Sequence, residues 1–120
     1  MDIGIVNDLT ICIESLQKVL ATTPEHRVVW VARNGQEAVE ECESNLGINL
    51  VLMDIKMPVM NGKDAMNEIK KLRPDLPIIA LSAFAMESDK ETALANGFDS
   101  YLSKPIDKKL LFELINKFSK

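Results

Sequence analysis

The sequence predicts an α/β domain in which five strand–helix units form one doubly wound, five-stranded parallel sheet, a (βα)5 arrangement. Five short apolar runs alternate along the chain with five segments of helical periodicity. The runs are mostly continuous in their apolar character, which is typical of strands buried on both faces. No repeat, low-complexity tract or linker interrupts the 120 residues, so we expect residues 1–120 to form a single domain without an output domain.

The expected strands are the apolar runs IGIV, VVWVA, LVLM, IIAL and SYLS, at residues 3–6, 28–32, 50–53, 78–81 and 100–103. The expected helices lie between and after them, at about residues 9–21, 35–44, 62–72, 88–96 and 107–118. In the third helix, apolar residues recur at helical spacing and predict one buried stripe, formed by Ala65, Met66, Ile69 and Leu72.

Three helix boundaries carry local signals. Asn34, with Glu37 three residues later, predicts a helix N-cap partnered by an acid at the third helical position. Pro74 ends the third helix, because a proline disfavours the helical conformation of the residue before it. Gly97 follows the fourth helix and supplies the left-handed conformation that commonly ends one. These signals place helix ends independently of the apolar periodicity.

The order of the strands follows from their connections. Parallel strands joined by helices need right-handed crossovers, which place the helices on both faces of the sheet. For five strands the common doubly wound order is 2-1-3-4-5, and ligands bind beyond the carboxyl ends of the strands, between the first and the third. The residues that directly follow each apolar run are therefore the candidate site.

Charge and hydropathy exclude two classes of partner. The net charge is −4 and the lysines are scattered, so the chain offers no basic surface for direct nucleic-acid binding. No apolar run approaches the roughly 18 residues of a membrane span, and the acidic start at Asp2 does not resemble a secretory signal. We therefore expect a cytoplasmic protein that binds neither nucleic acid nor membrane.

The cysteines and the single histidine do not form a metal or redox site. Cys12 and Cys42 lie thirty residues apart, so neither a CxxC redox pair nor a zinc site can be built from them. We expect both to be small buried hydrophobic residues. His26 has no second histidine with which to share a metal, and we expect it at the surface.

Polar side chains follow the four strands that border the predicted crevice. They are Asn7 and Asp8 after the first strand, Asp54 after the third, Ser82 after the fourth and Lys104 after the fifth. Arg33 and Asn34 follow the second strand, which lies at the edge of the sheet, away from the crevice. Two carboxylates suit Mg²⁺, while a lysine and a hydroxyl can contact phosphoryl oxygens. One carboxylate is then available to attack phosphorus, so this set predicts a phosphoryl-acceptor site.

The motifs DIKMP, LSA and YLSKP, together with the acidic residue after the first strand, resemble those of response regulator receiver domains of two-component signalling. The resemblance covers essentially the whole chain and implies the flavodoxin-like receiver fold. It implies that Asp54 is the phosphoacceptor, that Asp8 and the main-chain carbonyl of Lys56 are further Mg²⁺ ligands, and that Lys104 contacts the phosphoryl group. It also implies that Ser82 is the switch hydroxyl and Tyr101 the switch aromatic.

The resemblance further implies a regulatory domain rather than an enzyme in its own right. Its phosphoryl donor is a sensor histidine kinase or a histidine phosphotransfer protein, and its output is a downstream protein or an attached domain. Phosphorylation of Asp54 is expected to change the face formed by the fourth helix, fifth strand and fifth helix. Hydrolysis, which the domain assists, resets it.

One position departs from the family pattern. Receivers usually carry two adjacent acids after the first strand, and here the first of the two is Asn7. The amide removes one negative charge, which lessens repulsion between carboxylates but weakens the attraction for a divalent ion. We expect Mg²⁺ to bind through Asp8 and Asp54 more weakly than with two acids, with Asn7 as a weak ligand or one that acts through water.

The two halves resemble different branches of the family. Residues 3–42 are similar to the receivers of chemotaxis methylesterases, and the part from about residue 46 is similar to receivers attached to hybrid sensor kinases. A composite sequence is one interpretation of this difference. Two other functions stay open: a flavodoxin-like module that binds a flavin, which the acids and Lys104 oppose, and an interaction scaffold that is not phosphorylated. Tyr101 is also compatible with ordinary packing.

Overall fold

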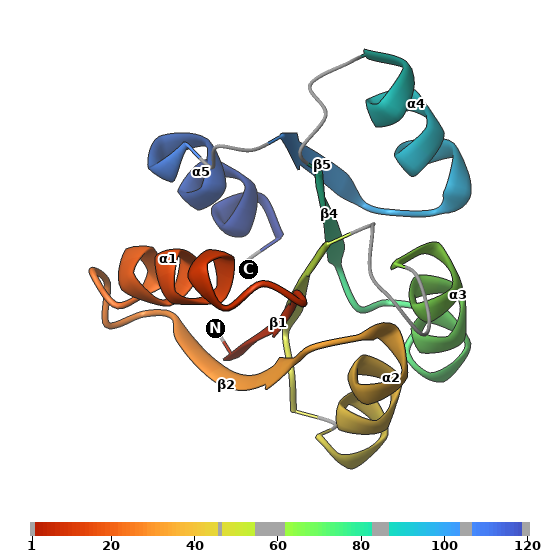
Figure 1. The fold of residues 1–120 in the computed structure, drawn as a ribbon, viewed down its shortest axis with the longest axis horizontal. Helices are drawn as coiled ribbons and strands as arrows, with labels where there is room; N and C mark the ends of the chain where they lie inside the picture. Colours follow the sequence, from red (N-terminus) through yellow and green to blue (C-terminus); the bar gives the residue numbers. More distant parts are fainter. Residues whose placement is uncertain (1, 46, 55–61, 83–86, 104–106, 119–120) are drawn as a thin grey trace.

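The computed structural model describes residues 2–45, 47–54, 62–82, 87–103 and 107–118 (Figure 1). Its strands are β1 (Asp2–Val6), β2 (Arg27–Ala32), β3 (Leu50–Asp54), β4 (Ile78–Ser82) and β5 (Ser100–Ser103). Its helices are α1 (Thr10–Leu20), α2 (Gly35–Ser44), α3 (Gly62–Leu72), α4 (Glu87–Asn96) and α5 (Lys108–Phe118). Each predicted element is present, and its ends differ from the prediction by no more than one residue.

The five strands form one parallel sheet in the order β2-β1-β3-β4-β5, as predicted. Helices cover both faces: α1 and α5 lie on one side of the sheet, and α2, α3 and α4 lie on the other (Figure 1). This arrangement follows from right-handed crossovers whose direction reverses between β1 and β3. The carboxyl ends of the strands consequently meet at one edge of the sheet.

The central strand β3 shows how the sheet separates the core into two layers. Val51 and Met53 point into the layer beneath α2, α3 and α4, whereas Leu50 and Leu52 point into the layer beneath α1 and α5. All four side chains are completely buried, as expected for a strand covered on both faces. The apolar run therefore continues without polar interruption until Asp54.

The predicted cap of α2 is confirmed. Asn34 Oδ1 accepts a hydrogen bond from the Glu37 amide at 2.9 Å, and Asn34 Nδ2 donates to Glu37 Oε2 at 3.0 Å. Helix α3 ends at Leu72, two residues before Pro74, also as predicted. These local signals therefore determine both helix ends.

Gly97 ends α4 through a Schellman motif. Its φ of 118° lies in the region that favours glycine, and its amide donates to the Leu94 carbonyl at 3.2 Å. The Phe98 amide donates to the Ala93 carbonyl at the same distance. Gly97 thus turns the chain from α4 toward β5, and Phe98 enters the core.

The first strand carries a second glycine with a packing role. The pairing of β1 with β2 shifts between Ile3 and Gly4, so that Gly4 lies beside Trp30. A Cβ atom at Gly4 would overlap three carbons of the Trp30 ring. The indole therefore occupies space that any side chain at position 4 would need.

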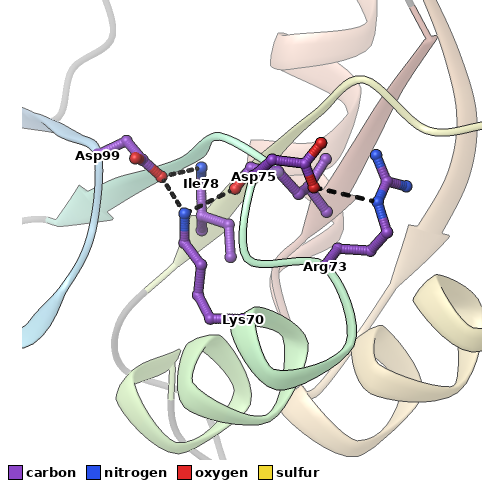
Figure 2. A network of polar contacts seen from close by, with 6 residues as sticks. Lys70, Arg73, Asp75, Ile78 and Asp99 are labelled. Carbon is purple, nitrogen blue, oxygen red and sulfur yellow. Dashed lines mark hydrogen bonds and ion pairs between the residues drawn. The ribbon is translucent and has the colours of Figure 1, made fainter.

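A polar network ties the amino ends of β4 and β5 to the end of α3 (Figure 2). Lys70 Nζ donates to Asp99 Oδ2 at 2.7 Å and to the Leu76 carbonyl at 2.8 Å. The same Asp99 oxygen accepts a hydrogen bond from the Ile78 amide at 2.8 Å. This network lies at the sheet edge opposite the one where Asp54 ends β3.

The expected surface position of His26 is wrong. The residue is buried, and its ring stacks on Phe112 of α5 with the ring centroids 6.0 Å apart. Burial lowers the pKa of His26, the positive chain N-terminus lowers it further, and Glu25 opposes the shift. The sequence could not show this contact, because it joins the start of β2 to a helix near the other end of the chain.

The two cysteines differ in burial. Cys42 is fully buried as expected, and burial raises the pKa of its thiol to about 11. Cys12, which lies on α1, is only partly buried, so the expectation was wrong for this residue. Among the described residues, no helix has the length and apolar character to cross a membrane.

Candidate functional site

The register of the sheet brings the predicted site residues together. Asp54 ends β3 and pairs with Leu81 of β4. On its other side, Val6 of β1 pairs with Met53 of β3. The residues that follow these two, Asn7 and Asp54, continue the same register. Neighbouring parallel strands are about 4.8 Å apart. Asp54 is therefore flanked closely by the end of β1 on one side and by the end of β4 on the other.

Asp54 and Asn7 also lie on the same face of the sheet. Side chains alternate between faces along a strand. Ile5 and Leu52 both belong to the layer beneath α1 and α5, and each lies two residues before a site residue. Asp54 is only 6% exposed and Asn7 is completely buried, so the polar groups sit within the mouth of the sheet rather than on its outside.

The chain leaves β1 through a tight turn organised by Asn7. The Asn7 amide donates to the Ala32 carbonyl at 3.0 Å, which extends the pairing with β2 by one residue. Asn7 Oδ1 then accepts a hydrogen bond from the Leu9 amide at 2.9 Å, the pattern of an Asx turn. Asp8 lies inside this turn and is partly exposed. A carboxylate is thus held next to the buried end of the sheet.

Ser82 and Tyr101 form the second part of the site. Ser82 ends β4, is 6% exposed, and pairs with Ser103 of β5. Tyr101 pairs with Ala80, which lies on the same face as Ser82 two residues earlier. Tyr101 is partly buried against the core layer beneath α2, α3 and α4. The two candidate switch residues therefore share one face of neighbouring strands.

Two predicted site residues, Lys56 and Lys104, lie outside the described residues. Their predicted roles stay predictions. Ser103, which precedes Lys104, is placed beside Ser82, so the described part of β5 does reach the same edge.

Sequence reasoning missed a role for Arg33 at the rim of this edge. We expected the residue after β2 to lie away from the crevice. Arg33 Nη1 donates to Thr10 Oγ1 at 3.0 Å, so the side chain spans from the end of β2 to the first residue of α1, two residues after Asp8. Strand order alone could not reveal this contact, because it depends on the reach of a long side chain.

The residues at this edge fit a magnesium ion. Two carboxylates, Asp8 and Asp54, are hard oxygen donors, and Mg²⁺ usually takes one or two protein carboxylates and keeps several waters. Over the described ranges, no group of three or more His, Cys, Asp or Glu side chains is placed to hold a metal. Two carboxylates suit a Mg²⁺ ion that keeps several of its waters.

The comparison with protein families settles what kind of domain carries this site. The family described as response regulator receiver domain matches residues 3–116. The chain belongs to this family. It is therefore a receiver domain of two-component signalling, and the family resemblance seen in the sequence is confirmed.

Curated relatives come from both branches that the sequence resembles. A protein-glutamate methylesterase/protein-glutamine glutaminase of Mesorhizobium japonicum is 39% identical over 98 residues, which cover 81% of this chain and 29% of that protein. Hybrid signal transduction histidine kinase I of Dictyostelium discoideum is 38% identical over 96 residues, covering 73% of this chain and 6% of that protein. The methylesterase similarity extends well beyond residues 3–42, so a composite origin is not needed to explain it.

Solved receivers share the fold over the whole chain. A chain of the CheX-CheY-BeF3-Mg²⁺ complex from Borrelia burgdorferi has a TM-score of 0.89 and 25% identity, covering 100% of this receiver and 90% of that chain. The response regulator domain of Thermotoga maritima CheB has a TM-score of 0.83 and 28% identity, covering 98% and 92%. Receiver folds are regulatory. The chain spans only about a fifth to three tenths of the length of the methylesterases reported among its matches, from 21% to 29%.

Proposed function

We propose that the protein is a phosphorylation-dependent signalling switch in which Asp54 accepts a phosphoryl group. The observation that carries this proposal is the placement of Asp54, buried at the end of the central strand. Asn7 continues its register on one side and Ser82 ends the neighbouring strand on the other. A carboxylate in this position meets a ligand only through the mouth of the sheet, where Asp8 also lies.

In this switch, a carboxylate oxygen of Asp54 forms a bond to phosphorus while the bond from phosphorus to the donor's histidine nitrogen breaks. Mg²⁺ would be held by Asp8 and Asp54, and by the Lys56 carbonyl that the family implies, and it supplies positive charge for the phosphoryl oxygens. Ser82 donates a hydrogen bond to the phosphoryl group, and Lys104 contacts it as a cation. Hydrolysis of the acyl phosphate returns Asp54 to its starting state.

The output is a change of the face formed by α4, β5 and α5. Ser82 and Tyr101 lie on one face of adjacent strands, so inward movement of the hydroxyl toward a new dianionic group opens space near the ring. Phosphorylation then shifts the population between two packings of this region. A downstream protein, or an output domain on the same chain, reads the difference.

The partner that delivers the phosphoryl group is a sensor histidine kinase or a histidine phosphotransfer protein. The similarity to a hybrid histidine kinase supports this assignment. We place the protein in the cytoplasm, where such kinases expose their phosphorylated histidine, and we expect neither nucleic acid nor membrane as a direct partner.

A second candidate is an interaction scaffold with the receiver fold that is not phosphorylated. The observation in its favour is Asn7, which leaves the edge of the sheet with one acid fewer than the usual pair. The two candidates differ in one measurable property, which is whether Asp54 takes up a phosphoryl group.

The test is incubation of the purified chain with Mg²⁺ and acetyl phosphate, read by intact mass. Asp54→Asn keeps the size of the side chain but removes the nucleophile, and Asp75→Asn removes an acid that is 82% exposed on the loop after α3. We expect one phosphoryl group on the wild type and on Asp75→Asn, and none on Asp54→Asn. Absence of any adduct on the wild type, with no binding of beryllofluoride, would instead favour the scaffold.

A further inference from the structure

The side chain of Asn7 has a fixed orientation. Its Oδ1 accepts the hydrogen bond from the Leu9 amide at 2.9 Å, and only the oxygen of an amide can face that N–H donor. The amide nitrogen therefore points to the opposite side of the group. The one oxygen that could bind a metal ion directly already uses one of its two lone pairs for the backbone.

The nitrogen of the same amide is buried and has no partner among the residues that the structure describes. Asn7 is completely inaccessible to solvent, and Nδ2 finds no hydrogen-bond acceptor within those described ranges. Buried donors in folded proteins are nearly always paired, so an unpaired one next to a functional residue needs an explanation, and a bound ligand is one that the position of Asn7 suits. Asn34, the N-cap of α2, uses both ends of its amide, in contrast to Asn7.

The surroundings of Nδ2 indicate which ligand would satisfy it. Asn7 continues the register of β1 opposite Asp54 and lies on the same face of the sheet. An amide N–H₂ group has no lone pair for a cation, and its hydrogens carry partial positive charge. An anionic oxygen attached to the neighbouring Asp54 is the acceptor that this donor suits.

We propose that the Asn7 amide donates a hydrogen bond to a phosphoryl oxygen carried on Asp54, and that Asn7 is not a ligand of the divalent ion. The proposal rests on the function proposed above. In this role Asn7 contacts the phosphoryl group directly. It replaces part of the electrostatic stabilisation of that group that Mg²⁺ would provide if position 7 were an acid. The phosphorylated state then depends on Mg²⁺ less than it would with two acids, because a neutral donor both lowers repulsion and contacts the dianion directly.

The test separates the binding of metal from the binding of a phosphoryl mimic in Asn7→Ala and Asn7→Ser. The serine hydroxyl can still accept from the Leu9 amide, so this variant keeps the turn and loses only the long donor. Mg²⁺ affinity without beryllofluoride, and beryllofluoride affinity at saturating Mg²⁺, are each measured by amide chemical shifts, with thermal unfolding as the check of folding.

We expect both variants to bind beryllofluoride about tenfold more weakly, as for loss of one charge-assisted hydrogen bond, and to bind Mg²⁺ within about twofold of the wild type. Weaker Mg²⁺ binding with unchanged beryllofluoride binding at saturation would identify Asn7 as a metal ligand and overturn the proposal. Unchanged values of both would also overturn it. If the wild type itself takes no beryllofluoride, or Asp54→Asn takes it equally well, the proposed function fails instead.

Discussion

Ile78 and Asp99 are hydrogen-bonded to each other twice at the start of the sheet. The Asp99 amide donates to the Ile78 carbonyl at 2.9 Å. The Ile78 amide donates in turn to Asp99 Oδ2 at 2.8 Å, as Figure 2 shows. Lys70 shares the same carboxylate oxygen. One aspartate thus joins the end of α3 to the first residue of β4 and to the turn before β5, at the edge opposite the proposed phosphorylation site.

Replacing Asp99 by alanine should lower the free energy of unfolding by about 1–2 kcal/mol. The Ile78 amide and the Lys70 ammonium group would lose their shared acceptor, and partial exposure of both charged side chains moderates the cost. Chemical denaturation measures the change. Asp75→Ala, which removes an exposed acid 3.7 Å from Arg73, should change stability by less than about 0.5 kcal/mol. Equal effects of the two variants would contradict the role assigned to Asp99.

Gly4→Ala should destabilise the fold by about 1–3 kcal/mol or more, because its Cβ would overlap the Trp30 ring in a closely packed layer. Gly47 is the matched control, since a Cβ there meets no atom within 4 Å. Gly47→Ala should leave stability nearly unchanged or raise it slightly. Thermal unfolding of both variants checks the prediction, and Trp30, the only tryptophan, reports the change around the indole by fluorescence. A tolerated alanine at position 4 would show that the indole can move away freely.

His26 should make the protein less stable as the pH falls. The pKa of His26 is lowered in the folded state, so the unfolded chain binds the proton first as the pH drops below about 6.5. Stability is thus full above that value and declines toward the lower folded-state pKa. Unfolding by urea between about pH 5 and pH 8 measures the slope.

The control for this slope is His26→Phe, which keeps an aromatic ring against Phe112 but cannot be protonated. Because the chain has no other histidine, the difference in slope between the two proteins belongs to His26. We expect the variant to keep its stability over the range in which the wild type loses it. Parallel curves for the two proteins would show that the imidazole is not the group responsible.

Asn7→Asp should tighten Mg²⁺ binding roughly tenfold, because it adds a negative charge beside Asp54 and Asp8 at a site intermediate between water and protein interior. The aspartate can still accept the hydrogen bond from the Leu9 amide, so the turn is retained. Asn116→Asp adds the same charge to the exposed face of α5 and should have little effect. Mg²⁺ titration compares the three proteins, and unchanged or weaker binding by Asn7→Asp would refute the expectation.

The sequence by itself determined the fold class and the elements, and it predicted the main site residues. Continuous apolar runs and helical periodicity are local signals, and so are the Asn34–Glu37 cap and Gly97, so each could be recognised within a few residues of the chain. The parallel order follows from general connection rules. Asp54 could be recognised because a charged residue is unusual at the end of a fully apolar strand. The predicted order of the strands then brought Asp8 to the same edge of the sheet.

Only the tertiary structure decided how distant parts of the chain meet. The stacking of His26 on Phe112 and the double link between Ile78 and Asp99 join segments far apart in sequence, and no local pattern records such contacts. The orientation of Asn7 was equally hidden. The asparagine in the sequence shows only that a charge is missing, whereas the structure shows that Oδ1 accepts from the Leu9 amide and that Nδ2 is buried without an acceptor among the described residues. The burial and the orientation of a side chain depend on how it packs, and this packing forms only when the whole chain has folded.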